Sequence, residues 1–225
     1  MSQTKLVTFD VYMALLDIES SLVPVVMRAL GLPSETATAF VRLWRAKQME
    51  RAAISNSLDK ERTSFRDATM MGLAYVAGRN GVELTQQLRE ELVLAWDSLQ
   101  PWPEANDVVA AIKAKGIATA ILSNGDEDML AAVARRFPTG FDHILSSEKA
   151  GKYKPHPAVY ALPTTELRIA KTDVVHVAGS ANDVLGTVAA GMACIWSNRH
   201  GDRLLDPSYP PTHMVSSLRD VPDLI

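Results

Sequence analysis

Predicted strands alternate with helical segments in the second half of the chain, and this alternation limits the possible folds more than any other feature. The predicted strands are separated by helical patterns at Glu104–Lys115, Glu127–Arg136, near Pro157 and at Ala181–Ala190. The predicted strands are Ala118–Leu122, His143–Ser146, Val174–Ala178 and Ala193–Ser197. Strands that alternate with helices usually pair in parallel, because each helix carries the chain back to the start of the next strand. The pattern therefore predicts a doubly wound α/β sheet, and Leu6–Phe9 adds one more strand.

A long helical block interrupts this α/β pattern after the first strand. Residues 20–99 form amphipathic runs with short breaks at Gly31–Ser34 and Gly78–Gly81, and Pro101-Trp-Pro103 closes the block. We therefore expect a Rossmann-like, parallel-sheet core from residues 1–16 and 99–225. Residues 17–98 are expected to form an inserted, all-helical cap.

Composition excludes several classes of partner. The 225 residues are 47% hydrophobic and 22% charged, with a net charge of −3, so no basic surface for nucleic acid is expected. The apolar runs are too short to cross a bilayer, and the polar start is not typical of a signal peptide. The only cysteine, Cys194, excludes an internal disulfide and lies in an apolar strand, which indicates a packing role. A cytoplasmic location is expected.

Polar residues follow the predicted strands where the chain leaves the sheet. They are Asp10, Ser123-Asn124, the loop with Lys154, and the segment ending at Asp183. Ligands of open α/β sheets bind beyond the carboxyl ends of the strands. We therefore expect these side chains to meet in one pocket.

Each of these residues has a functional and a structural interpretation. Asp10 can be a nucleophile or general base, or it can cap a helix. Ser123 and Asn124 can hold an anion or form another cap, and Lys154 can pair with Asp10 or be an ordinary exposed lysine. Asp183 can orient Lys154 or a water molecule, or cap the helix that follows.

The set Asp10, Ser123, Lys154 and Asp183 resembles the haloacid dehalogenase superfamily over the whole chain. Most members are magnesium-dependent phosphatases with a second aspartate two positions after the first, where this chain has Tyr12. Gly179 stands where those phosphatases usually carry another acid. Because a hard divalent cation needs several oxygen ligands, we expect no metal and no cofactor.

With a tyrosine at position 12, the chain resembles the L-2-haloacid dehalogenase subgroup of this superfamily. Other motifs of the chain also resemble those of this subgroup. Leu43–Glu50 resembles its cap helix, in which the arginine matching Arg45 binds substrate and receives the halide. Without the resemblance, Arg45 would be interpreted as an exposed arginine that pairs with Glu50 or is solvated. The other matching stretches are Ser123-Asn124-Gly125, Tyr153–Tyr160 and Trp196–Arg199.

The resemblance implies a two-step mechanism on a small anionic substrate. The Asp10 carboxylate attacks C2 of a 2-haloacid and expels halide, and water held with help from Lys154 and Asp183 then hydrolyses the ester. An apolar cap would desolvate the carboxylate, with Trp44, Met49 and Phe65 as candidate lining or simply cap core. The further predicted substrate contacts are Val11, Tyr12, Ser123, Asn124, Tyr160, Ser180 and Asn182. The resemblance also implies a homodimer.

Several residues depart from the subgroup's pattern. Met13-Ala14 replaces Gly-Thr, and Ala178, Ser180 and Asn182 replace Ser, Asn and Trp. An alternative is the same ester chemistry with a different leaving group, as in hydrolases that open azetidine-2-carboxylate at its C–N bond. A third hypothesis is a catalytically silent binding protein, and a phosphatase ranks last.

Overall fold

The structure is a computed structural model that describes residues 4–58 and 60–225. The chain divides into two compact units. One, here called the core unit, contains the chain up to Leu16 and from Pro101 onward; the other, the helical unit, is Asp17–Gln100. Where the chain passes between them, β2 (Leu16–Asp17) and β3 (Gln100–Pro101) pair as a two-stranded sheet.

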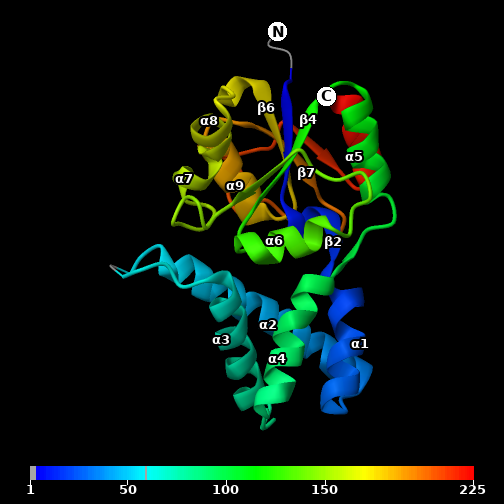
Figure 1. The fold of residues 1–225 in the computed structure, drawn as a ribbon, viewed down its shortest axis with the longest axis vertical. Helices are drawn as coiled ribbons and strands as arrows, with labels where there is room; N and C mark the ends of the chain where they lie inside the picture. The colour runs from blue at the N-terminus through cyan, green and yellow to red at the C-terminus, as the bar shows by residue number, and fades with distance from the viewer. Residues whose placement is uncertain (1–3, 59) are drawn as a thin grey trace. The chain divides into compact units, whose positions relative to one another are not determined.

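The core unit is built on a parallel sheet of six strands in the order β5-β4-β1-β6-β7-β8 (Figure 1). Five strands lie where the sequence predicts them, so the predicted doubly wound α/β fold is confirmed. Their bounds are β1 Leu6–Phe9, β4 Ala118–Ser123, β5 His143–Ser146, β6 Val174–Ala178 and β7 Ala193–Ser197. The sixth strand, β8 (His213–Val215), was not predicted from the sequence.

Helices cover both faces of this sheet, with α8 and α9 on one side and α5 on the other (Figure 1). The helices are α5 Ala105–Ala114, α6 Glu127–Ala134, α7 Pro157–Tyr160, α8 Leu162–Leu167 and α9 Ala181–Ala189, with 3₁₀ turns at Lys171–Asp173 and Leu218–Leu224. All four residues of β1 are buried, as expected for a strand in a parallel sheet with helices on both faces. Cys194 is buried with Ala178, Val184 and Trp196, which confirms its packing role.

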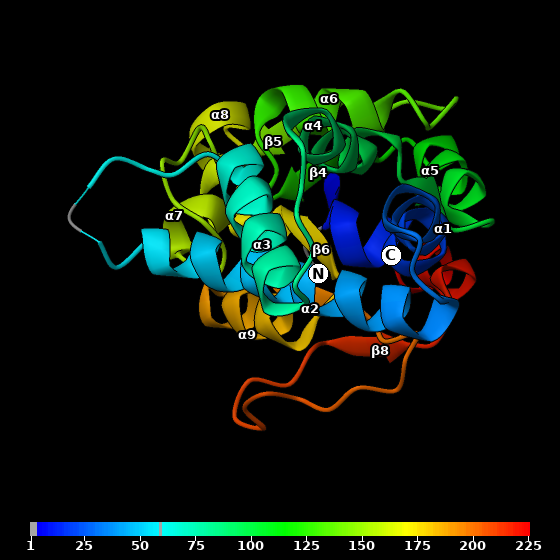
Figure 2. The same cartoon turned by 90° about the horizontal axis from the view of Figure 1, so that it is seen from below.

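In its described residues, 17–58 and 60–100, the helical unit contains four α-helices and one 3₁₀ turn. Figure 2 shows these helices from below. They are α1 Ile18–Leu30, α2 Ser34–Ser55, α3 Phe65–Arg79 and α4 Gln86–Leu94, followed by Ala95–Ser98. Helices α2 and α3 pack closely, and their buried aromatic residues include Trp44 and Phe65. In the described part of the chain, no helix is both long enough and apolar enough to cross a membrane.

A short π-helical turn, Val11–Leu15, follows β1 directly. Asp10 is its N-cap residue and accepts a hydrogen bond from the Met13 backbone nitrogen. Single π turns occur frequently at functional sites. Asp10 therefore lies at the carboxyl edge of a central strand, where open α/β sheets bind ligands.

Candidate active site

Asp10 is almost fully buried between a hydroxyl, an ammonium and a backbone N–H group. Its Oδ1 accepts a hydrogen bond from Ser123 Oγ at 3.0 Å and lies 3.6 Å from Lys154 Nζ. Its Oδ2 accepts from the Met13 nitrogen at 3.3 Å. The interpretation of Asp10 as a cap is therefore confirmed, because the carboxylate caps the π turn, and its role as a nucleophile or general base stays a prediction.

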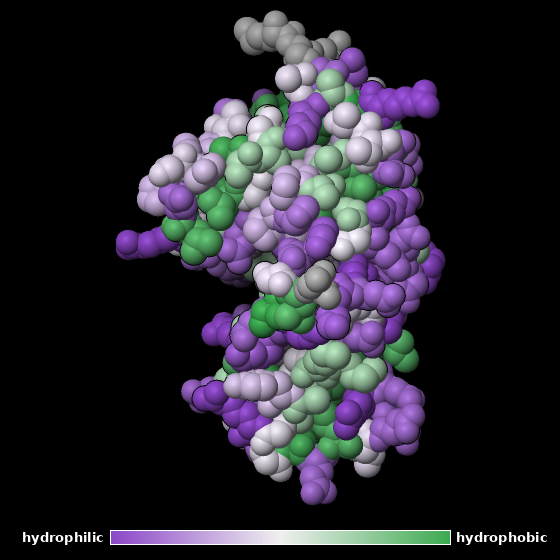
Figure 3. Space-filling model, turned by 90° about the vertical axis from the view of Figure 1, so that its left-hand side faces the viewer, coloured by the Kyte–Doolittle hydropathy of each residue, from purple (hydrophilic) through white to green (hydrophobic). Residues whose placement is uncertain are grey.

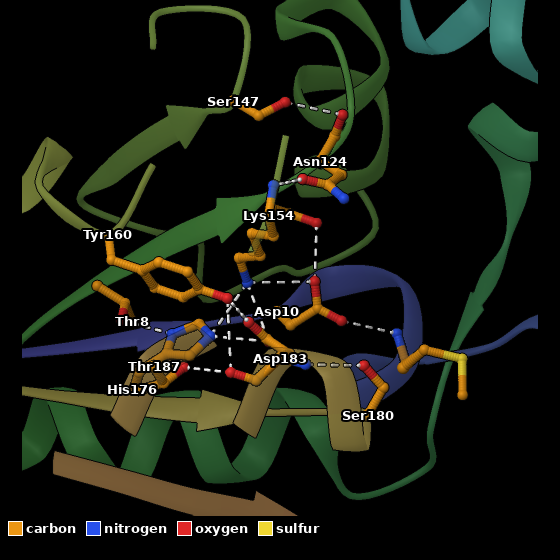
Figure 4. A network of polar contacts seen from close by, with 12 residues as sticks. Thr8, Asp10, Asn124, Ser147, Lys154, Tyr160, His176, Ser180, Asp183 and Thr187 are labelled. Carbon is orange, nitrogen blue, oxygen red and sulfur yellow. Dashed lines mark hydrogen bonds and ion pairs between the residues drawn. The ribbon is translucent and has the colours of Figure 1, made fainter. Parts of the chain in front are cut away.

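Lys154 is held in place at both its backbone and its side chain. Its backbone nitrogen donates to Asn124 Oδ1 at 2.8 Å, and its ammonium donates to Asp183 Oδ2 at 3.0 Å. Only 7% of the residue is exposed, so it is not an ordinary surface lysine. The polar residues after β4, β5 and β6 thus meet beside Asp10 as predicted (Figure 4).

Asp183 is anchored through both carboxylate oxygens. Tyr160 donates its hydroxyl to Oδ1 at 2.8 Å, while Oδ2 contacts Lys154. Burial raises the pKa of Asp183, but the charge of Lys154 and the contact with His176 outweigh burial and hold that pKa well below its usual range. Burial and the neighbouring Asp183 raise the pKa of Tyr160 well above its usual value, so Tyr160 stays a neutral donor.

Ser180, and not Asp183, caps α9. The Asp183 backbone nitrogen donates to Ser180 Oγ at 3.4 Å. The alternative interpretation of Asp183 as a helix cap is therefore wrong, and the Asp183 side chain is left to contact Lys154. Ser123 and Asn124 do not cap α6 either, since Asp126 occupies that position.

His176 also belongs to this cluster, although it was not among the predicted site residues. It lies in the middle of β6 with no exposed surface, and its Nε2 is 2.9 Å from Asp183 Oδ2 and 3.1 Å from Lys154 Nζ. The available signal was a single ionisable residue inside the otherwise apolar strand Val174–Ala178. That signal alone does not distinguish a site residue from a satisfied core histidine.

Tyr12 and Gly179 stand where the resemblance places metal-binding acids in related phosphatases, and both positions are closely packed. A Cβ atom added to Gly179 would lie 2.3 Å from the Ala14 backbone nitrogen, so no acid fits there without moving the π turn. Tyr12 is buried, and a Cβ atom on Gly125 would lie 2.8 Å from its hydroxyl. Among the described residues, no group of three or more His, Cys, Asp or Glu side chains is arranged to hold a metal ion.

In the helical unit, Arg45 is half-buried rather than solvated. It donates to Gln48 Oε1 at 2.5 Å, and its guanidinium lies 6.0 Å from the ring centre of Phe65. Trp44 and Phe65 are fully buried in this unit and Met49 is half-buried, as the core interpretation expects. A substrate role for these four residues stays a prediction.

A cavity of about 350 Å³ adjoins the π turn in the core unit. It is lined by Met13, Gly179, Ser180, Trp196, Ser197, Asn198, Arg199, His200, Gly201 and Asp202. Two further residues were predicted to contact the substrate. Val11, which follows Asp10 in the chain, is buried, and Asn182 is exposed at the start of α9. Substrate contact by either residue stays a prediction.

A model of the family described as haloacid dehalogenase-like hydrolase matches residues 4–191. The chain belongs to this family. It is similar to the (S)-2-haloacid dehalogenase of Pseudomonas sp. strain YL, with 31% identity over 100% of this chain and 95% of the relative. The predicted superfamily membership is therefore confirmed.

Two solved structures resemble the chain over nearly its full length. One is a dehalogenase with an intermediate complex, with a TM-score of 0.91, 26% identity, and coverage of 100% of this chain and 98% of the other. The second is L-2-haloacid dehalogenase from Xanthobacter autotrophicus with chloropropionic acid covalently bound. Its TM-score is 0.86 at 25% identity, covering 99% and 98% of the two chains.

Proposed function

We propose that the protein is a metal-independent 2-haloacid dehalogenase that forms an ester on Asp10. The observation that carries this proposal is the buried Asp10 carboxylate, with Ser123 Oγ at 3.0 Å and Lys154 Nζ at 3.6 Å. Tyr12 and Gly179 occupy the positions where related phosphatases carry acids, so the site has few carboxylate oxygens for a metal ion. The groups around Asp10 therefore suit attack on carbon better than metal binding. The full-length similarity to (S)-2-haloacid dehalogenases supports the same activity.

In the first step, an oxygen of Asp10 forms a bond to C2 of the substrate as the carbon–halogen bond breaks. The halogen leaves with the bonding electron pair as halide, and C2 remains linked to Asp10 as an ester. The Ser123 hydroxyl and the Lys154 ammonium both lie beside Oδ1. Their fixed positions orient the carboxylate before the substrate arrives, which lowers the entropic cost of attack.

In the second step, water adds to the Asp10 carbonyl carbon and the ester C–O bond breaks. The oxygen attached to C2 leaves as the hydroxyl of a 2-hydroxyacid, Asp10 is restored, and one proton is released to solvent. Asp183 Oδ1 accepts one hydrogen bond from Tyr160, and a carboxylate oxygen can accept a second, from water. The low pKa of Asp183 makes it a lasting partner for Lys154 rather than a strong base.

Charge balance supports a role for Arg45. In the core unit, the carboxylates of Asp10 and Asp183 face the single ammonium of Lys154 within the cluster described above. An anionic substrate adds another negative charge, so a further cation is needed to hold it and to receive the halide. Arg45, in the helical unit, has a planar guanidinium whose N–H groups match a carboxylate or halide. Closure of an apolar cap would desolvate the reacting carboxylate.

The assembly and location follow as parts of the same proposal. Ile54, Met71 and Tyr75 of α2 and α3 are each more than 40% exposed, and hydrophobic side chains gather on the surface of the helical unit (Figure 3). Such a patch supports a homodimer, which sedimentation analysis would test. The buried free thiol of Cys194 is consistent with a reducing cytoplasm, and cell fractionation would test this location.

The activity is tested by incubating the protein with L-2-chloropropionate, with and without a chelator. Equal chloride release in both tubes, lost in Asp10→Asn, is the expected result. Chloride release that needs added magnesium would contradict the proposal, as would hydrolysis of p-nitrophenyl phosphate with magnesium and no chloride release. Binding of the haloacid without any turnover would favour a silent binding protein.

A second candidate is hydrolysis of a C–N bond in azetidine-2-carboxylate by the same ester chemistry. The observation that favours it is the presence of the polar side chains Asn198, His200 and Asp202 in the lining of the cavity beside Met13. Met13-Ala14 and Asn182 also depart from the haloacid pattern. Consumption of azetidine-2-carboxylate without chloride release from any 2-haloacid would establish this alternative.

A further inference from the structure

His176 is fixed in the sheet from both sides. It lies in β6 opposite Thr8 of β1 and Cys194 of β7, and none of its surface is exposed. Its Nδ1 is 2.8 Å from Thr8 Oγ1. The ring therefore has a firm attachment to the centre of the sheet, on the side away from Asp183.

The other ring nitrogen meets Lys154, whose ammonium lies beside Asp10, and Asp183, which binds that ammonium. Nε2 lies 2.9 Å from Asp183 Oδ2 and 3.1 Å from Lys154 Nζ, and these two groups are themselves 3.0 Å apart. Figure 4 shows His176, Lys154 and Asp183 converging on this point. The imidazole thus connects the ammonium and the carboxylate to the sheet.

The groups that face His176 favour an uncharged ring. Burial and the charge of Lys154 lower the pKa of His176, while Asp183 and Asp10 act in the opposite direction without reversing the shift. Tyr160, whose ring centre is 6.2 Å away, and Cys194 both stay neutral, since burial raises the pKa of each, that of Cys194 to about 12.

A neutral imidazole keeps the contact with Thr8 in both tautomers, and in each tautomer Nε2 makes one of its two contacts. With the proton on Nε2, the ring donates to Asp183 and accepts at Nδ1 from the Thr8 hydroxyl. With the proton on Nδ1, the ring donates to Thr8 and accepts at Nε2 from Lys154. An imidazolium would instead place a second positive charge 3.1 Å from the ammonium.

We infer that His176 is a positioning residue that holds Lys154 and Asp183 in place for hydrolysis of the Asp10 ester. This inference rests on the proposed function and adds to it a residue that never touches the substrate. Its action depends on Nε2 and not on the volume of the ring. Loss of Nε2 frees Lys154 and Asp183 to shift relative to the ester.

His176→Asn and His176→Gln form a matched pair for the test. The Gln amide reaches the place of Nε2, whereas the Asn amide reaches only the place of Nδ1 beside Thr8. A displacement of about 1 Å in a catalytic group costs on the order of 10²-fold, so His176→Asn should lower kcat by about 10- to 100-fold. Because slower ester hydrolysis lowers KM together with kcat, kcat/KM should change much less. His176→Gln should recover most of that loss, and Thr8→Val should change kcat less than His176→Asn does.

Rapid mixing with L-2-chloropropionate separates this inference from the proposed function. His176→Asn should release a burst of chloride close to one per site and accumulate the ester, because Asp183 takes part only in the second step and that step is slowed more than the first. Equal kcat in wild type, His176→Asn and His176→Gln would overturn the inference while leaving the dehalogenase proposal intact. No chloride release from wild type would contradict the proposed function instead.

A measurement on the wild-type protein covers the case in which His176→Asn does not fold. Nitrogen-15 NMR of histidine-labelled protein distinguishes neutral tautomers from imidazolium, and His176 is assigned by the signal missing from His176→Gln. A neutral ring at pH 7 supports the inference. An imidazolium signal for His176 at pH 7 would overturn it.

Discussion

Arg45 owes its orientation to a series of buried polar contacts inside the helical unit. Gln48, which has no exposed surface, accepts from Arg45 and donates to Thr69 Oγ1 at 2.5 Å. Thr69 in turn donates to the Phe65 carbonyl oxygen at 2.7 Å. The guanidinium is therefore held by Gln48 of the same helix, α2, and Gln48 is held in turn by Thr69 of α3, so Arg45 is not simply a solvated surface group.

We predict that Arg45→Lys lowers kcat/KM for L-2-chloropropionate by about 10-fold or more. A lysine ammonium cannot reproduce the two parallel hydrogen bonds of a guanidinium, and hydrogen bonds to charged groups contribute about 1.5–3 kcal/mol. Steady-state kinetics measure the change. Arg42→Lys is the matched control on the same helix, because Arg42 is exposed and pairs with Glu19, and it should leave turnover unchanged. Equal turnover in both variants would remove Arg45 from the site.

At the residue scale, sequence patterns could identify Asp10, Lys154 and Asp183 because each follows a predicted strand. They could not identify His176, because its contacts depend on the register that places it opposite Thr8. They also could not show that Asp10 caps a helical turn and faces an ammonium at the same time. These facts depend on three-dimensional distances between residues far apart in the chain.

At the scale of elements, α9 approaches α7 so closely that only glycine fits at position 186. A Cβ atom on Gly186 would lie 2.3 Å from the Tyr160 hydroxyl, which donates to Asp183. The packing of two helices therefore fixes one of the donors to Asp183. Tyr160 contributes to the site only while this approach is preserved.

We predict that Gly186→Ala displaces Tyr160 and lowers kcat, although alanine is the better helix former. Overpacking costs about 1–3 kcal/mol, which exceeds the roughly 1 kcal/mol that alanine contributes in a helix. Denaturant unfolding and steady-state kinetics measure both effects. Gly78→Ala in α3 is the control, because no atom lies within 4 Å of its added Cβ, and it should stabilise the protein without changing kcat. Full activity in Gly186→Ala would show that Tyr160 is dispensable.

Strands that form apolar runs were predictable, whereas elements without such a run were not. The strands β1, β4, β6 and β7 are apolar runs bounded by turn residues, so their sequence carries the signal. The three residues of β8 have a burial pattern of exposed, exposed and buried, which leaves no apolar run to detect. The π turn at Val11–Leu15 has no periodicity of its own and forms because Asp10 caps it and Gly179 packs against it.

At the scale of the whole molecule, buried ionisable groups link stability to pH. The pKa of His176 is lowered from 6.5, so below pH 6.5 the unfolded chain binds a proton that the folded protein resists. Stability contributed by this group is present above pH 6.5 and is lost as the pH falls below that value. The pKa of Asp183 is lowered from 3.8, so its contribution is present above pH 3.8 and is lost only at lower pH.

We predict that the free energy of unfolding falls between pH 7.5 and pH 5.5, and that His176→Gln reduces this fall. Glutamine does not titrate, so the unfolded variant binds no extra proton at this position. Urea unfolding of both proteins at the two pH values gives the comparison. An equal decrease in wild type and His176→Gln would show that the imidazole is not buried in its neutral form.

The central claim is that the Asp10 carboxylate bonds to carbon during turnover, and trapping that ester tests it most directly. The protein is mixed with excess L-2-chloropropionate in the presence of chelator, quenched in acid within one turnover, digested and analysed by mass spectrometry. We predict that the peptide containing Asp10 gains the mass of one propionate substituent, and that Asp10→Asn shows no such gain. Chloride release without an adduct, or with an adduct on another peptide, would contradict the account.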